Sequence, residues 1–100
     1  MSFLRNLFGM GPKVNCQELV NNGAILIDVR TPSEFNSGHV KGSTNVPLDQ
    51  LQTKAKKIKQ MNKPVVLCCQ SGMRSAQATS ILKRAGIEQV YNGGGWHKFA

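Results

Sequence analysis

Two adjacent cysteines, Cys68 and Cys69, stand directly before a short polar loop that contains Arg74. An apolar run precedes the loop and a helical pattern follows it, so the backbone amides of residues 70–74 are expected to point inward, where they favour an anion. Amides at the start of a helix and a nearby arginine also lower the pKa of a thiol from about 8.5. The loop therefore predicts a nucleophilic cysteine beside an anion-binding site.

We assign the catalytic role to Cys69, because Gly72 follows it by three residues and allows the backbone to turn sharply. Cys68 completes the strand and should point away, since successive strand residues face opposite sides. Arg74 lies in the first turn of a helix, where the helix dipole disfavours a positive charge, and this position argues for an anionic partner. The predicted substrate-binding residues are Gln70, Ser71, Gly72, Met73 and Arg74.

Other polar side chains are expected to have structural roles. Asp28 and Arg30 flank the end of a buried apolar run and are predicted to form an ion pair that supports the neighbouring loops. The chain contains three cysteines, Cys16, Cys68 and Cys69, and two of them are adjacent. An odd number with an adjacent pair argues against a disulfide framework and suits a reducing cytoplasm. His39 and His97 stand in no zinc-ligand spacing, so we predict no metal and no cofactor.

Strands and helices alternate along the chain and must position this loop. Apolar runs predict strands at residues 24–29, 43–46, 64–68 and 89–92, and helical patterns lie near 15–22, 31–38, 48–60 and 75–85. Such alternation indicates an α/β fold with a mainly parallel sheet. In sheets of this kind, functional sites form at the carboxyl ends of the strands.

The loop and its flanking segments resemble the rhodanese family. Residues 69–75 (CQSGMRS) are similar to its six-residue active-site loop with the following serine, and residues 28–35 (DVRTPSEF) and 38–47 (GHVKGSTNVP) resemble its upstream signatures. Residues 91–95 (YNGGG) resemble its closing segment, although Phe99 stands where a tryptophan is usual. The resemblance implies a three-layer rhodanese-like fold, with a mainly parallel central sheet of about five strands and helices on both faces.

The same resemblance implies sulfur transfer. Cys69 would attack the outer sulfur of thiosulfate or another small anionic sulfane donor, sulfite would leave, and a persulfide would remain on the enzyme. Cyanide, a thiol or a partner protein would then accept the sulfur. Nucleophilic catalysis of this kind, with loop dipoles around the anion, needs no cofactor and no general base. We assign residues 13–100 to the rhodanese-like domain and residues 1–12 to a flexible or short amphipathic extension.

Three other functions fit parts of the pattern. Counting from Cys68 gives a C-x5-R spacing followed by Ser75, so a cysteine-dependent phosphatase or arsenate-reductase-like enzyme could use Cys68 or Cys69. Gly72 and the upstream signatures favour sulfur transfer. A six-residue loop also encloses a smaller volume than a seven-residue one, which suits one extra sulfur better than a phosphate group. A non-enzymatic binding module and a sulfur-relay protein that receives a partner's persulfide are the remaining alternatives.

The chain is strongly basic, with a formal net charge of +8 at pH 7. Such a charge raises the local concentration of anions without choosing among them. The densest run contains Lys54, Lys56, Lys57 and Lys59 in a helical pattern, which is typical of a solvated helix face. No aromatic residues interleave with these lysines, so we predict no nucleic-acid partner. Residues 1–10 contain no export signal or membrane span, and we predict a cytoplasmic protein without a membrane partner.

Overall fold

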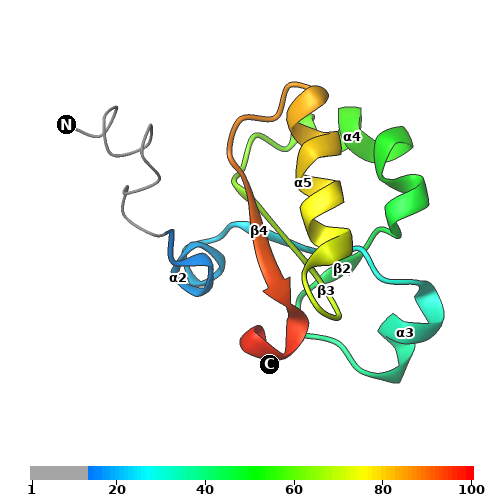
Figure 1. Ribbon diagram of the computed structural model, residues 1–100. Coiled ribbons are helices and arrows are strands. Elements are labelled where there is room, and N and C mark those ends of the chain that lie inside the picture. Colours follow the sequence, from blue (N-terminus) through cyan, green and yellow to red (C-terminus); the bar gives the residue numbers. More distant parts are fainter. Residues whose placement is uncertain (1–13) are drawn as a thin grey trace.

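The computed structural model describes residues 14–100, in which four strands lie between two layers of helices (Figure 1). The extension predicted at residues 1–12 lies outside the described part. The helices are α2 (Cys16–Asn21), α3 (Pro32–Ser37), α4 (Leu51–Gln60) and α5 (Met73–Arg84). The strands are β1 (Ile25–Asp28), β2 (Thr44–Asn45), β3 (Val65–Cys69) and β4 (Val90–Gly95), and two 3₁₀ turns are η1 (Leu48–Gln50) and η2 (Trp96–Phe99).

The four strands form one parallel sheet in the order β2-β1-β3-β4. This arrangement confirms the predicted α/β fold with a parallel sheet. About five strands were expected from the family resemblance, whereas the described residues contain four, one for each apolar run in the sequence. The central position of β3 places the carboxyl end of that strand, and the loop after it, in the middle of one edge of the sheet.

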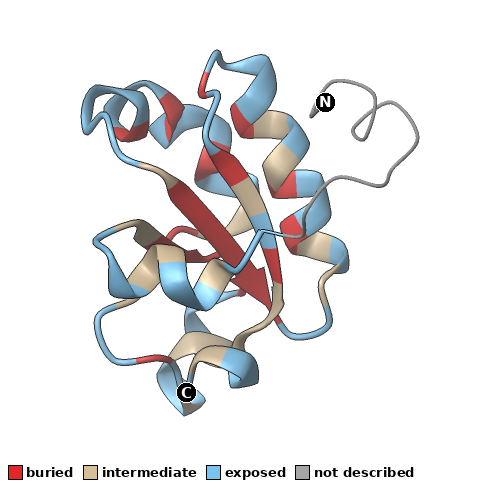
Figure 2. Cartoon of the chain, turned by 90° about the vertical axis from the view of Figure 1, so that its left-hand side faces the viewer, coloured by how far each residue is buried: buried red, intermediate tan, exposed pale blue. Residues whose placement is uncertain are grey.

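Strand β3 is buried along its whole length, as its continuous apolar run predicts (Figure 2). Its side chains alternate between the two faces of the sheet. Val65, Leu67 and Cys69 join the apolar cluster under α4 and α5, whereas Val66 and Cys68 join the cluster that includes side chains of α2 and η2. The two adjacent cysteines therefore face opposite layers of the molecule.

Local sequence signals explain where two of the helices begin. Helix α3 begins with a capping box, in which the Thr31 hydroxyl accepts from the Glu34 amide and the Glu34 carboxylate accepts from the Thr31 amide, and Pro32 occupies the first turn. Helix α5 begins at Met73, two residues before the predicted start, because Gly72 has a φ of +104° and turns the chain directly into the helix.

Strand β4 extends beyond the predicted range of residues 89–92, because the three glycines after Asn92 continue the strand to Gly95. Pairing with β3 shifts register between Leu67 and Cys68, so that Asn92 pairs with Leu67 and Gly94 pairs with Cys68. The extra residue, Gly93, lies so close to β3 that an added Cβ would be 2.8 Å from Val66 Cγ1. The glycines therefore serve close packing at a bulge.

No helix within residues 14–100 is both long and apolar enough to cross a bilayer. All three cysteines are free thiols. Among the described residues, no group of three His, Cys, Asp or Glu side chains is arranged to hold a metal ion.

Candidate active site

Cys69 is the last residue of β3, and the loop that follows it folds back over its side chain. The left-handed conformation of Gly72 directs the amide of this residue toward the sulfur, and Gly72 N donates to Cys69 Sγ at 2.9 Å. The amide of Ser75, in the first turn of α5, donates to the same sulfur at 3.4 Å. The sulfur therefore lies within a partial ring of donors at the start of a helix, where a negative charge is favoured.

The contacts of Cys69 favour its thiolate although the residue is only 1% exposed. Burial raises the pKa of the thiol, but hydrogen bonds from the Ser75 side chain and from the amides of Ser75, Gly72 and Ser71 outweigh burial and lower that pKa. The Ser75 oxygen lies 3.5 Å from the sulfur. The site thus contains a cysteine whose ionised form is stabilised by donors of the loop and of the helix start.

Cys68 has the opposite chemistry although it is the adjacent residue. It is fully buried on the other face of the sheet, as the alternation of strand residues predicts. Burial, and then the negative charge of Asp28, raise the pKa of the Cys68 thiol to about 12. A nucleophile at Cys68, which the C-x5-R spacing requires, therefore has no structural support.

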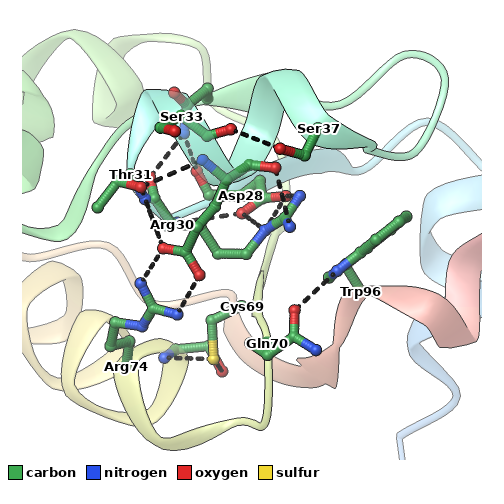
Figure 3. Close-up of polar contacts among 12 residues, drawn as sticks. Asp28, Arg30, Thr31, Ser33, Ser37, Cys69, Gln70, Arg74 and Trp96 are labelled. Atoms are coloured by element: carbon green, nitrogen blue, oxygen red, sulfur yellow. Dashed lines mark hydrogen bonds and ion pairs between the residues drawn. The ribbon is translucent and has the colours of Figure 1, made fainter.

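Arg74 was expected to face an anion, and its guanidinium instead holds the Glu34 carboxylate through two hydrogen bonds (Figure 3). Arg74 Nη1 lies 2.6 Å from Glu34 Oε1, and Nη2 lies 2.9 Å from Oε2. This pairing lowers the pKa of Glu34 to about 2 and raises the pKa of Arg74, to which the charge of Cys69 contributes less. Arg74 therefore joins α5 to α3 near the sulfur.

Asp28 and Arg30 form the predicted ion pair, with Arg30 Nη2 at 2.7 Å from Asp28 Oδ2 in a fully buried position. The same nitrogen donates to the carbonyl oxygen of Gly38 at 2.7 Å, which fixes the end of α3. The guanidinium lies under the ring of Trp96, 4.6 Å from its centroid. Trp96 Nε1 also donates to Gln70 Oε1 at 3.3 Å, so the ion pair supports one end of the loop (Figure 3).

The five predicted substrate-binding residues lie around the sulfur, but they present mainly backbone to it. The side chains of Gln70 and Ser71 are exposed to solvent, and Met73 is 79% exposed. Hydrogen bonds to the sulfur come from the amides of Ser71 and Gly72 within this group. An anion at the loop would therefore meet amide groups, with Arg74 and its carboxylate partner at the rim.

Sequence reasoning did not assign functional roles to Ser75 and Asn92, whose side chains complete the site. The Ser75 hydroxyl donates to Asn92 Oδ1 at 2.5 Å and lies within reach of Cys69. Asn92 follows Val90 by two residues in β4, and Val90 packs in the same cluster as Cys69. A polar residue on the same face of a strand as a buried residue, near the carboxyl end of the strand, was the available signal.

Comparisons with known proteins agree with the fold described above. A family model described as "Rhodanese-like domain" matches residues 14–100. The uncharacterized protein YqhL of Bacillus subtilis is 44% identical over 77 residues, which cover 76% of this chain and 60% of that relative. Thiosulfate sulfurtransferase PspE of Escherichia coli is 37% identical over 70 residues, or 69% of this chain and 67% of PspE. A solved structure described as "rhodanese with anions from E. coli" has a TM-score of 0.69 at 34% identity, and the match covers 78% of this chain and 92% of that one.

Proposed function

This chain belongs to the rhodanese-like family, and from that premise we propose that it is a sulfurtransferase in which Cys69 carries the transferred sulfur as a persulfide. The donor is thiosulfate or a persulfide, and the acceptor is cyanide, a thiol or a partner protein. The observation that supports this function is the set of amides around Cys69, with Gly72 N at 2.9 Å and Ser75 N at 3.4 Å from the sulfur. We place the transferase unit at residues 13–100, in a reducing cytoplasm that suits its three free thiols.

In the first step, the Cys69 thiolate attacks the outer sulfur of thiosulfate. A new S–S bond forms, the S–S bond of the donor breaks, and sulfite leaves with the bonding electron pair. The negative charge then lies on the terminal sulfur of the persulfide, where the loop amides can stabilise it. The hydrogen bonds to Cys69 lower the pKa of its thiol, which favours the thiolate form that attacks the donor.

In the second step, the acceptor attacks the terminal sulfur and the Cys69 thiolate leaves. The donors that stabilised the thiolate at the start also stabilise it as the leaving group. We assign Gln70, Ser71, Gly72, Met73 and Arg74 to the binding of the anionic donor, chiefly through their backbone amides. Asp28 and Arg30 have a supporting role, since they anchor Gly38 and Trp96 around the loop.

Separate replacements of the two cysteines test this function. Cys69→Ser is expected to abolish thiosulfate:cyanide transfer, whereas Cys68→Ser, the matched control, should retain it. After thiosulfate treatment, mass spectrometry with fragmentation between residues 68 and 69 should locate one added sulfur atom on Cys69. Sulfur on Cys68, an unmodified wild-type chain, or aryl-phosphate hydrolysis in place of sulfur transfer would each contradict the proposal.

A further inference from the structure

The hydroxyl of Ser75 has one proton and three neighbouring atoms that could accept it. These atoms are Asn92 Oδ1 at 2.5 Å, the carbonyl oxygen of Gly72 at 3.1 Å and the sulfur of Cys69 at 3.5 Å. A hydroxyl group donates one hydrogen bond at a time. The hydroxyl can therefore donate to only one of these acceptors at a time. Which acceptor it donates to determines how strongly the Cys69 thiolate is stabilised.

The carbonyl oxygen of Gly72 already accepts hydrogen bonds from donors other than Ser75. It accepts from the amide of Ala76 at 3.0 Å, in the first turn of α5, and from Asn92 Nδ2 at 3.3 Å. A carbonyl oxygen has two lone pairs, and these two donors occupy them. The competition is therefore between Asn92 Oδ1 and the Cys69 sulfur.

The side chain of Asn92 is oriented by two further contacts. Gly94 N donates to Asn92 Oδ1 at 2.9 Å, and Asn92 Nδ2 donates to the Gly72 carbonyl oxygen. The reversed amide would place donor against donor at Gly94 and acceptor against acceptor at Gly72. The bulge in β4 brings the Gly94 amide to this position, so the strand presents the Asn92 oxygen to Ser75.

We propose that Asn92 is a positioning residue whose side-chain oxygen shares the single hydroxyl proton of Ser75 with the Cys69 sulfur. Asn92 holds the proton while residue 69 is a thiol, and the hydroxyl turns to the sulfur when residue 69 is a thiolate. The inference rests on the proposed function, because it concerns the nucleophile of that reaction. It adds a residue of β4, outside the active-site loop, that controls how reactive the nucleophile is.

The hydrogen bonds remain balanced in both positions of the hydroxyl. As a thiol, Cys69 donates to Ser75 Oγ, and Ser75 donates to Asn92 Oδ1. As a thiolate, Cys69 can only accept, and the Ser75 proton then serves the sulfur. Asn92 Oδ1 accepts from the Gly94 amide in both cases, so rotation of the Ser75 hydroxyl leaves no buried group unpaired.

Several charged or titratable groups surround Cys69, Ser75 and Asn92, and they are the same in all the variants compared below. Arg74 on α5 lies near the sulfur and is held by Glu34 of α3. Cys68 on β3 is the adjacent thiol, and on the C-terminal turn η2 the ammonium nitrogen of Lys98 lies 2.9 Å from the position of a Cβ on Gly94. None of these side chains contacts the Ser75 hydroxyl in the described residues.

A double-mutant cycle tests the coupling through the pH dependence of Cys69 alkylation by iodoacetamide, in a Cys16→Ser background. Asn92→Ala removes the competing acceptor, so alkylation at neutral pH should become about two- to fivefold faster, with its midpoint at lower pH. Ser75→Ala should slow alkylation and raise the midpoint. In the Ser75→Ala background, Asn92→Ala should have no effect, because no shared proton remains.

Asn92→Asp is a near-isosteric second variant that should hold the Ser75 proton more strongly. We expect slower alkylation than in the parent, and a smaller slowing when Ser75 is replaced by alanine, where only the added charge acts. Ser75→Thr retains the hydroxyl and should restore the coupling. An Asn92→Ala effect of equal size with and without Ser75, or no shift of the midpoint in either Asn92 variant, would overturn the proposal. Because alkylation needs no sulfur donor, loss of sulfur transfer with the coupling intact would count against the proposed function alone.

Discussion

At the scale of single residues, the neighbours of a buried thiol can reverse the effect of burial on its pKa. Cys68 and Cys69 are both buried and adjacent, yet the pKa of Cys68 is raised to about 12 and the pKa of Cys69 is lowered. Burial acts in the same direction on both. The hydrogen-bond donors of the loop and of α5 reach only Cys69 and outweigh burial there, whereas the charge of Asp28 adds to the effect of burial at Cys68.

Gly72→Ala tests how much the conformation of the loop contributes to this difference. Gly72 has a φ of +104°, and an added Cβ would have only ordinary contact with Gly94, so the cost comes from the backbone rather than from a clash. We expect a loss of stability of about 1–2 kcal/mol in urea unfolding, and slower alkylation of Cys69 because the Gly72 amide is displaced.

Gly42→Ala is the matched control for this substitution, since Gly42 has a φ of +88° with no atom near an added Cβ. It should lower stability by a similar amount and leave the alkylation of Cys69 unchanged. Equal slowing of alkylation in both variants would show that general destabilisation, rather than the Gly72 amide, affects the cysteine.

At the scale of elements, α3 is connected to the strands and to α5 by two ion pairs that differ in environment. Asp28 and Arg30 are buried and connect the end of β1 with the Gly38 carbonyl at the end of α3. Glu34 and Arg74 are about one-third exposed and join α3 to the first turn of α5. A buried pair and a partly exposed pair should respond differently to mutation and to pH.

Asp28→Ala leaves the Arg30 charge buried without its partner. We expect a loss of about 3–5 kcal/mol in the free energy of unfolding, measured with urea. The double replacement of Asp28 by alanine and Arg30 by methionine should lose less, because no buried charge then remains unpaired. A double variant that is less stable than Asp28→Ala alone would contradict this account.

The Glu34 carboxylate predicts a dependence of stability on acid pH. Its pKa is about 2 in the folded chain and lies near 4.5 without its partners, so its stabilisation is present above pH 4.5 and is lost as pH falls toward 2. Glu34→Gln should therefore be less stable than the parent at neutral pH, and the difference should shrink through this range. The effect should be small, because solvent and salt screen a partly exposed pair. A stability difference that is constant from pH 6 to about pH 2 would contradict the assignment.

At the scale of the whole molecule, the sheet order and the net charge act on the same site. The central strand β3 ends at the middle of the carboxyl edge, where loops from neighbouring strands surround Cys69. The formal net charge of +8 adds an attraction for anions that does not depend on any single contact. Both features should favour the approach of a small anionic donor.

Alkylation of Cys69 by two reagents that differ in charge tests the contribution of this net charge. Iodoacetate is an anion and iodoacetamide is neutral, so the ratio of their rates at Cys69 reports the local potential. The ratio should fall severalfold as ionic strength rises from about 0.02 to about 0.5 M, since salt shortens the Debye length. A ratio that does not change with salt would show that the net charge has no effect at the site.

The sequence by itself determined the features that depend on local patterns. Apolar runs and capping signals predicted the alternation of strands and helices, and with it the parallel sheet. The two-residue period of a strand predicted that Cys68 and Cys69 face opposite sides, which the two apolar clusters confirm. These features arise from interactions among residues that are close in the chain, so a short window of sequence contains the information.

Only the tertiary structure decided which distant side chains meet at the sulfur. Arg74 binds Glu34 across 40 positions, and Ser75 binds Asn92 across 17. Both contacts depend on how α3, α5 and β4 are placed around β3, and the second also depends on a one-residue shift of strand register. Such a shift moves a side chain by a full residue along the partner strand. The local sequence pattern does not reveal it, because register is set by packing between elements.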